Sequence, residues 1–276
     1  MTATPGEVED LFLSFLGDNY KSPKQIRTQM TKKLAKNPMS AKALAARAWA
    51  NCELEEFDDA IADATKAIEL CPGSYLPWHV RGSCYWRTDQ SEKAEPELTE
   101  AIRLADSVKL FLEDTYLFRG GLRCNDKRPE EAIEDLNQCL KLHPEHGWGY
   151  VFRGNAYCLL KKYRKAIKDF EKAIELDEED SYALSTLACL LATCPEAKVR
   201  DGQRALELAE LANDHSDNEY LSDLAAAHAE LGDFKQAVKI QKRAIKKCQE
   251  TEERVKLAKR LELFESGQPY HALWDE

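Results

Sequence analysis

A recurring pair of small residues is the feature that most constrains the fold of this 276-residue chain. A leading alanine is followed seven residues later by another alanine or, once, by a cysteine, as in Ala166 with Ala173. Successive leading alanines are 34, 38, 34, 39 and 32 residues apart; they are Ala60, Ala94, Ala132, Ala166, Ala205 and Ala237. A period of this length is typical of repeats built from one helical hairpin each.

A second marker lies twelve residues before four of the leading alanines, where an arginine precedes a small residue. These pairs are Arg47-Ala48, Arg81-Gly82, Arg119-Gly120 and Arg153-Gly154. Small residues at fixed offsets let two helices approach to about 8–10 Å. Because one hairpin cannot bury both of its faces, we expect successive hairpins to stack.

Composition favours an all-α fold, since Leu and Ala occur 34 times each while Val, Ile and Thr together number 27. No apolar stretch approaches the roughly 20 residues of a membrane span. The net charge of −10 repels phosphate groups. We therefore expect neither a nucleic-acid nor a membrane partner. The first apolar segment, 11–16, follows acidic residues instead of the Lys or Arg of a secretory signal, which predicts a cytoplasmic protein.

The period, the small residue of each first helix and the paired alanines resemble the tetratricopeptide repeat over roughly 40–248. Segment 147–178 carries the pattern best, with Gly154 and Ala166 in place. The resemblance implies a right-handed α-solenoid of stacked helical hairpins. The third copy is lengthened by residues 107–114, which we expect to extend its first helix. The fifth carries an insertion at 194–202 that, with its flanking Leu-Ala-Thr, is similar to a bacterial branch of the family.

The repeats predict a three-part organisation. Residues 1–39, with helices expected at 5–17 and 22–36, form a degenerate capping hairpin. Residues 251–276 form a capping helix and tail, which terminal repeats need. The six repeats between them occupy about 40–72, 73–106, 107–144, 145–179, 180–216 and 217–250.

Catalytic and metal-binding patterns are weak. The chain has no G-x-S-x-G motif, and helical solenoids rarely enclose a dry catalytic pocket, so we expect no enzyme and no cofactor. His143 and His146 could share a metal, but no further ligand lies nearby in sequence, which favours an inter-repeat turn in solvent. Acidic clusters such as 178–180 are expected to be solvated turns, because no EF-hand spacing accompanies them.

The nine cysteines are odd in number and form no C-x-x-C pair, which predicts reduced thiols. Cys52, Cys124 and Cys158 each lie four residues after the small residue of a first helix, and Cys189 lies one after it. They can therefore line one surface, or serve as small hydrophobic residues at crowded positions. A thiol-based metal or redox protein is accordingly our alternative function.

In the family that the chain resembles, first helices line a concave groove that binds a partner segment. Of the positions that clamp chaperone tails there, only Asn155 matches, so we expect no such clamp. The positions are instead mostly apolar and aromatic, and Trp49 and Trp148 are the expected exposed anchors, whereas Phe118 and Phe152 could equally pack between repeats. The candidate groove residues are Trp49, His79, Trp86, Phe118, Trp148, Phe152, Asn155 and Tyr182. The expected function is a non-catalytic adaptor that binds an apolar or aromatic segment of another protein.

Overall fold

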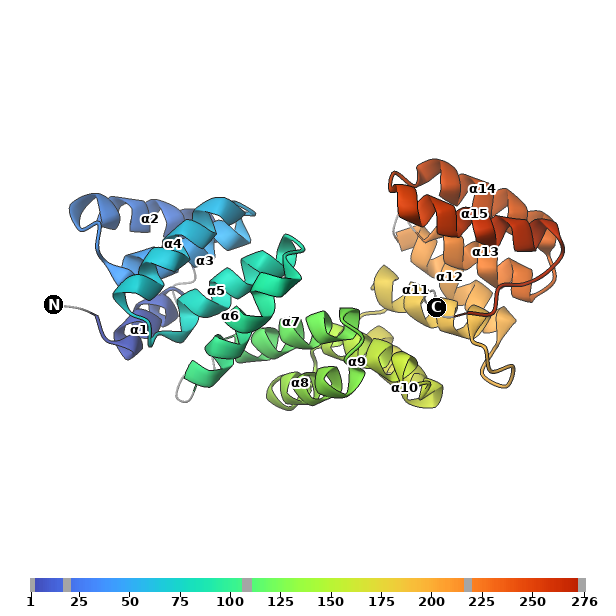
Figure 1. The fold of residues 1–276 in the computed structure, drawn as a ribbon, viewed down its shortest axis with the longest axis horizontal. Helices are drawn as coiled ribbons and strands as arrows, with labels where there is room; N and C mark the ends of the chain where they lie inside the picture. The colour runs from blue at the N-terminus through green and yellow to red at the C-terminus, as the bar shows by residue number, and fades with distance from the viewer. Residues whose placement is uncertain (1–2, 17–20, 106–110, 216–219, 273–276) are drawn as a thin grey trace. The chain divides into compact units, whose positions relative to one another are not determined.

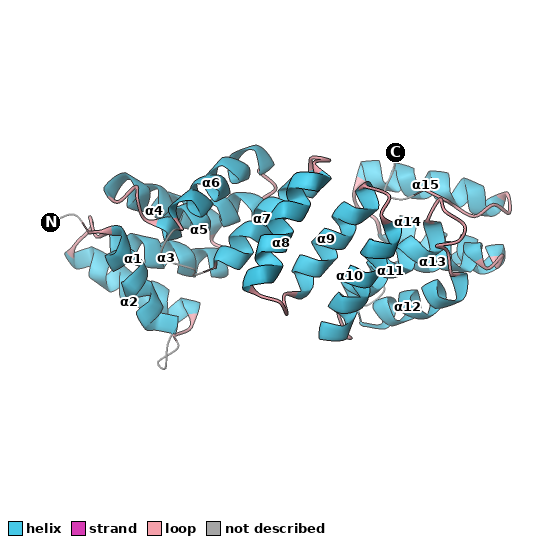
Figure 2. Cartoon of the chain, turned by 90° about the horizontal axis from the view of Figure 1, so that it is seen from below, coloured by secondary structure: helices cyan, strands magenta, loops and turns pink. Residues whose placement is uncertain are grey.

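The computed structural model describes residues 3–16, 21–105, 111–215 and 220–272. Within these ranges the chain forms fifteen α-helices and no strand (Figure 2). This agrees with the all-α class expected from the sequence. The chain divides into two compact units, residues 1–144 and residues 145–276, which we call unit 1 and unit 2 and describe separately.

Unit 1 contains three helical hairpins preceded by two helices, α1 (Pro5–Leu16) and α2 (Pro23–Lys36) (Figure 1). The hairpins are α3 (Ala41–Glu53) with α4 (Phe57–Leu70), α5 (Tyr75–Arg87) with α6 (Ser91–Leu104), and α7 (Leu112–Asn125) with α8 (Pro129–Leu142). The first helices pack against one another, α3 on α5 and α5 on α7, so they share one face of the unit. Of residues 107–114, which were expected to extend the first helix of the third repeat, 107–110 lie outside the described residues and 112–114 form the start of α7.

Unit 2 contains three further hairpins and a final helix. They are α9 (Gly147–Leu159) with α10 (Tyr163–Leu176), α11 (Ser181–Thr193) with α12 (Gly202–His215), α13 (Leu221–Glu230) with α14 (Phe234–Lys247), and then α15 (Thr251–Glu265). Helix α15 packs on α14, where Gln241 Nε2 donates to the carbonyl of Leu257 at 2.9 Å and Phe264 is buried. The insertion before α12 is attached to α13, because Arg200 donates to Glu230 at 2.8 Å.

The turns inside five of the six hairpins share one backbone geometry, whereas the turn between α11 and α12 holds the insertion. The central residue of each of these turns adopts a left-handed conformation, as at Glu55, Asp89, Lys127 and Lys161, with φ between 55° and 63°, and at Gly232, with φ of 81°. The next residue donates its N–H to the carbonyl five residues before it, for example Lys162 to Tyr157 at 2.8 Å. This is the Schellman arrangement that ends a helix, and it explains why the turns keep one length.

The small residues of the first helices lie where the second helix of the same hairpin crosses. A methyl group added at Gly154 would lie 2.4 Å from the Phe170 ring, and one at Gly82 or Gly120 would lie 2.8 Å from Leu98 or Leu136. These three partner side chains are fully buried. The close approach that the sequence predicted from its small residues is therefore confirmed at these three hairpins.

The arginine before each small residue pairs with an acid sixteen residues later, on the second helix. The bidentate pairs are Arg47–Asp63, Arg81–Glu97, Arg119–Asp135 and Arg153–Asp169, with N···O distances of 2.6–2.9 Å. In unit 1 each arginine also donates to a threonine of the preceding second helix, as Arg119 does to Thr99 at 3.1 Å. One guanidinium therefore joins three helices across two hairpins.

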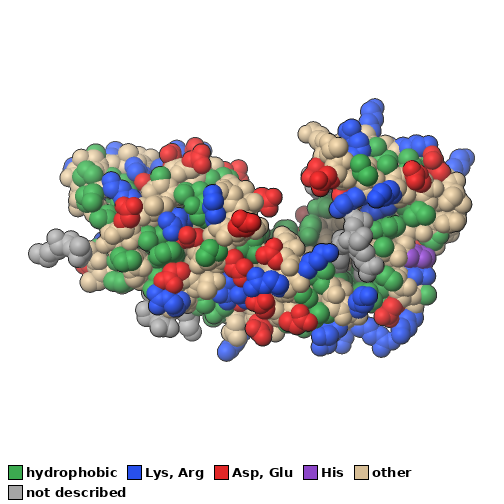
Figure 3. Space-filling view, viewed as in Figure 1, with side chains coloured by type: hydrophobic (Ala, Val, Ile, Leu, Met, Phe, Trp, Pro, Cys, Tyr) green, Lys and Arg blue, Asp and Glu red, His purple; other side chains and the backbone are tan. Residues whose placement is uncertain are grey.

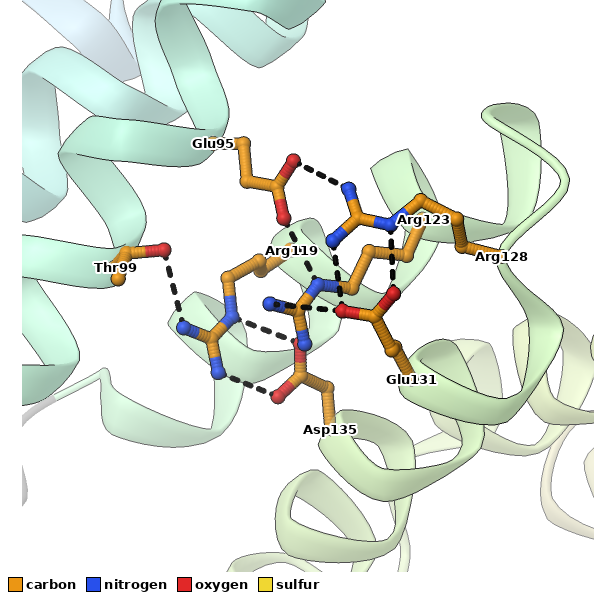
Figure 4. Close-up of polar contacts among 7 residues, drawn as sticks. All are labelled: Glu95, Thr99, Arg119, Arg123, Arg128, Glu131 and Asp135. Carbon is orange, nitrogen blue, oxygen red and sulfur yellow. Dashed lines mark hydrogen bonds and ion pairs between the residues drawn. The ribbon is translucent and has the colours of Figure 1, made fainter.

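These pairs extend into a network between α6, α7 and α8 (Figure 4). Arg123 donates to Glu95 and Asp135 at 3.0 Å each, and Arg128 donates to Glu95 and Glu131 at 2.7 Å each. Burial opposes ionisation of Glu95, but the hydrogen bonds from the two arginines outweigh it and lower the pKa of Glu95. Basic and acidic side chains accordingly lie interspersed over this part of unit 1 (Figure 3).

The N-terminal helices differ from the expected capping hairpin. Helix α2 packs on α3 as the second helix of a hairpin would, but α1 lies against α3 and α5. The reason is the apolar side of α1, where Val8, Phe12 and Phe15 are all buried. These side chains find apolar partners on the face shared by the first helices, so α1 covers that face.

Candidate protein-binding surfaces

Aromatic rings from four helices form a continuous row on the first-helix face of unit 1. Ring centroids of neighbouring members are 4.5–6.3 Å apart. In order, the members of this aromatic row are Phe12, Trp49, Phe111, His79, Phe118 and Trp86. The structure thus brings together all four candidate groove residues of unit 1, and it adds Phe12 and Phe111.

One end of the aromatic row is covered by α1. The Phe12 ring lies edge-on to Trp49 at 4.8 Å and 5.7 Å from the Phe111 ring. Phe12 is fully buried, and Trp49 is only 8% exposed. The expectation that Trp49 is an exposed anchor is therefore wrong in this structure, because a helix of the same chain covers it.

The other end of the aromatic row is less covered. Phe118 and Trp86 are both half-buried, and their rings stack at 4.5 Å. They pack against Leu98 and Leu122, which are buried beneath them. These two rings therefore belong partly to the inter-repeat core and still present a face to solvent.

A buried carboxylate fixes α1 to the start of α5. Glu9 is 2% exposed, and its Oε1 accepts hydrogen bonds from the Ser74 hydroxyl at 2.7 Å and the backbone N–H of Tyr75 at 3.0 Å. Ser74 is the N-cap of α5, yet its side chain does not cap that helix. Glu9 therefore supplies an acceptor at the positive end of the α5 dipole.

His79 belongs to a buried polar cluster in the same face. Its Nδ1 lies 2.8 Å from the hydroxyl oxygen of Thr115, which also contacts the Tyr75 hydroxyl and donates to the carbonyl of Phe111 at 2.8 Å. Because Thr115 has a single proton to donate, His79 Nδ1 and the Tyr75 hydroxyl must both donate to it. Burial lowers the pKa of His79 to about 4, so the ring is neutral at pH 7.

In unit 2, the candidate residues form a smaller aromatic cluster on α9 and α11. The Trp148 ring stacks on that of Tyr182 at 5.2 Å and lies 5.7 Å from that of Phe152. Trp148 is 44% exposed, whereas Phe152 and Tyr182 are half-buried. One turn further along α9, the side-chain oxygen of Asn155 is buried, and no residue in the described part of the chain forms a hydrogen bond with it. Trp148 is thus the most exposed ring among the candidate residues.

The cysteines occupy packed positions. Eight of the nine are buried, and Cys248 is half-buried. Burial raises the pKa of Cys124 and Cys189 to about 12 and also raises the pKa of Cys158, which disfavours the thiolate that metal binding and redox chemistry require. Cys52 is the exception, because a hydrogen bond from Cys84 and the charge of Arg87 lower its pKa.

Among the described residues, no group of three or more Cys, His, Asp or Glu side chains is arranged to hold a metal ion. The burial of the thiols therefore favours the packing explanation over the thiol-based alternative. A search of the described residues also finds no helix long and apolar enough to cross a membrane.

Two features of the sites were missed from the sequence. The pattern Val8, Phe12 and Phe15 indicates an amphipathic helix, but the face that it covers depends on tertiary structure. Phe111 was also missed, since it lies in the lengthened third repeat, where alignment to the other copies fails. The sixteen-residue offset from each arginine to its acid was visible, but only the hairpin geometry explains it.

Stacked helical hairpins with an aromatic first-helix face define a helical-repeat scaffold. Three family models of the tetratricopeptide repeat match residues 77–107, 148–180 and 219–254. The chain is therefore a tetratricopeptide-repeat protein, a class of protein–protein interaction scaffold.

A sequence relative and two solved structures are similar to this chain. The Protein SGT1 homolog of Oryza sativa subsp. japonica is 31% identical over 121 residues, which make up 44% of this chain but only 30% of that protein. The structure of YrrB, described as a TPR protein with an unusual peptide-binding site, has a TM-score of 0.56 at 20% identity and covers 73% of this chain and 97% of its own. The structure of the APC/C hetero-tetramer Cut9-Hcn1 has a TM-score of 0.62 at 17% identity, and the match covers 81% of this chain and 46% of the chain in that structure. Both structures support the fold alone.

Proposed function

We propose that this protein is a non-catalytic adaptor that binds an apolar or aromatic segment of a partner protein on its first-helix faces. The observation that carries the proposal is the exposure of Trp148, which stands 44% exposed while stacked on Tyr182. A large ring held in place by a second ring loses little freedom on binding, and tryptophan is strongly enriched among residues that dominate binding energy.

The surroundings of Trp148 support an apolar ligand. The neighbouring candidate side chains, Phe152, Tyr182 and Asn155, carry no charge. Asn155 adds a buried oxygen that can accept a hydrogen bond from the backbone of a bound segment. A partner would therefore bury an aromatic or aliphatic side chain against Trp148 and Tyr182. The cysteines are odd in number and form no C-x-x-C pair, which supports a reducing compartment, and we propose the cytoplasm.

A pull-down from lysate of the native cell, with a matched pair of variants, tests the proposal. Trp148→Ala removes the exposed ring, whereas Leu211→Ala removes an exposed apolar side chain, 47% exposed, from the second helix α12 of the same unit. We expect a partner that the wild-type protein and the Leu211 variant capture and the Trp148 variant does not. Equal capture by all three would place binding elsewhere and overturn the proposal.

A further inference from the structure

We propose that the first-helix face of unit 1 is a binding site for an amphipathic helix of a partner protein. The helix would carry a glutamate followed three residues later by a phenylalanine, and α1 occupies this site within the chain itself. The inference rests on the proposed adaptor function but concerns unit 1, where Trp148 plays no part. It identifies the partner by a sequence pattern that α1 displays.

Helix α1 contacts the site as a ligand would, through one side only. Val8, Phe12 and Phe15, at spacings of four and three residues, are buried, whereas Leu13 on the same helix is 45% exposed. This is the spacing by which an amphipathic helix binds in a groove. Phe12 is the central anchor, because its ring contacts both Trp49 and Phe111.

The carboxylate gives the site its specificity. Glu9 Oε1 accepts from Ser74 and from the backbone N–H of Tyr75, so an apolar or basic residue at this position would leave both donors buried without a partner. Glu9 and Phe12 lie three residues apart, on adjacent turns of the same side of α1. A partner helix therefore needs both groups at this spacing to make the same contacts.

Two observations indicate that α1 can be replaced. The second carboxylate oxygen of Glu9 is buried and has no hydrogen-bond partner among the described residues, so the helix fits the site imperfectly. The aromatic row also continues beyond α1 to Phe118 and Trp86, whose rings are only half-buried. A partner helix that also covers these two rings would bury more apolar surface than α1 does and would compete with it.

The test uses the full chain and a fluorescein-labelled peptide of residues 3–16. The wild-type protein should bind it weakly, because its own α1 competes. Phe12→Ala in the full chain weakens the binding of α1 to the site and changes no residue of α3, α5 or α7. It should therefore raise the affinity for the peptide at least tenfold. Leu13→Ala, at an exposed position of α1, is the matched control and should change nothing. Peptides carrying Glu9→Ala or Phe12→Ala should bind at least tenfold more weakly than the unaltered peptide.

A second variant releases α1 by a different route. An added Cβ at Gly73, in the turn before α5, would lie 3.2 Å from the ring of Pro5 at the start of α1. Gly73→Val should therefore weaken the docking of α1 and raise the affinity for a shorter peptide of residues 6–16, which lacks Pro5, while leaving every ring of the aromatic row intact. In the wild-type protein, excess peptide should speed hydrogen exchange of the α1 amides.

The proposal is overturned if neither folded variant binds the peptide better than wild type, or if α1 exchange is unaffected by saturating peptide. It is also overturned if the Phe12 variant dimerises and takes up no peptide, since a second copy would then fill the site. Trp148→Ala should leave peptide binding unchanged, so failure here and failure of the proposed adaptor surface in unit 2 are read separately.

Discussion

The Phe12 ring of α1 lies 4.8 Å from the Trp49 ring of α3, in edge-to-face contact, and this pair determines which aromatic surface of unit 1 faces solvent. Trp49 occupies a first-helix position where a groove anchor is expected, yet a side chain of the same protein covers it. Phe118, Trp86 and, in unit 2, Trp148 keep a solvent-facing side.

Removing one arginine of a repeated pair should destabilise unit 1. Within the described residues, Arg119→Ala leaves the carboxylate of Asp135, which is 3% exposed, paired with Arg123 alone, and we expect a loss of about 2–4 kcal/mol. The matched control is Arg103→Ala, since Arg103 is two-thirds exposed where it pairs with Glu100; this change should cost under about 1 kcal/mol. Urea unfolding measures both. Similar losses for the two variants would contradict a structural role for the repeated pair.

Overpacking the hairpin crossing should destabilise unit 2. Gly154→Ala places a methyl group 2.4 Å from the buried Phe170 ring, which cannot move aside without displacing its neighbours. We expect a loss of about 1–3 kcal/mol and a lower melting temperature. Gly147→Ala, at the start of the same helix, meets no atom within 4 Å and should not destabilise the protein. An unchanged melting temperature for Gly154→Ala would refute the close crossing.

Acidification should destabilise the protein through His79. Burial lowers its pKa from 6.5 to about 4, so the unfolded chain binds a proton at a higher pH than the folded chain. The stabilisation is therefore complete above about pH 6.5 and is lost as the pH falls toward 4. Between pH 7 and 4.5 we expect the wild-type protein to lose about 2–3 kcal/mol more than His79→Gln, measured by urea unfolding at both values. Burial also raises the pKa of Asp223, but this residue is present in both proteins, so its effect cancels when their losses are compared. Identical losses would show that His79 is not buried in neutral form.

A chaperone-type acidic tail should not bind. Only Asn155 matches the clamp pattern, and the net charge of −10 opposes an acidic peptide. Titration with a peptide ending in Glu-Glu-Val-Asp should give no saturable signal. Micromolar binding that disappears in Asn155→Ala would contradict this prediction.

The sequence predicted the repeated parts of the fold well because they depend on local spacing. Gly154 and Ala166 indicate a close helix crossing wherever they recur, and the structure confirms that crossing. The position of α1 was not predictable in this way. Its buried side was visible in Phe12 and Phe15, but which face it covers depends on contacts with α3 and α5 that are distant in sequence. The prediction that Trp49 is exposed failed for the same reason, because a repeat pattern places a residue on a face but does not indicate what covers that face.

Aromatic anchors on the first-helix faces should dominate binding of the partner, and the affinity of the captured partner for three proteins at low and high salt measures this. Isothermal titration of wild type, Trp148→Ala and Leu211→Ala should give a loss of about 2 kcal/mol or more, roughly 30-fold, for the Trp148 variant alone. The wild-type affinity should change little with salt, because burial of an aromatic ring is not screened. An unchanged affinity for Trp148→Ala, or a steep salt dependence in the wild-type protein, would contradict the claim.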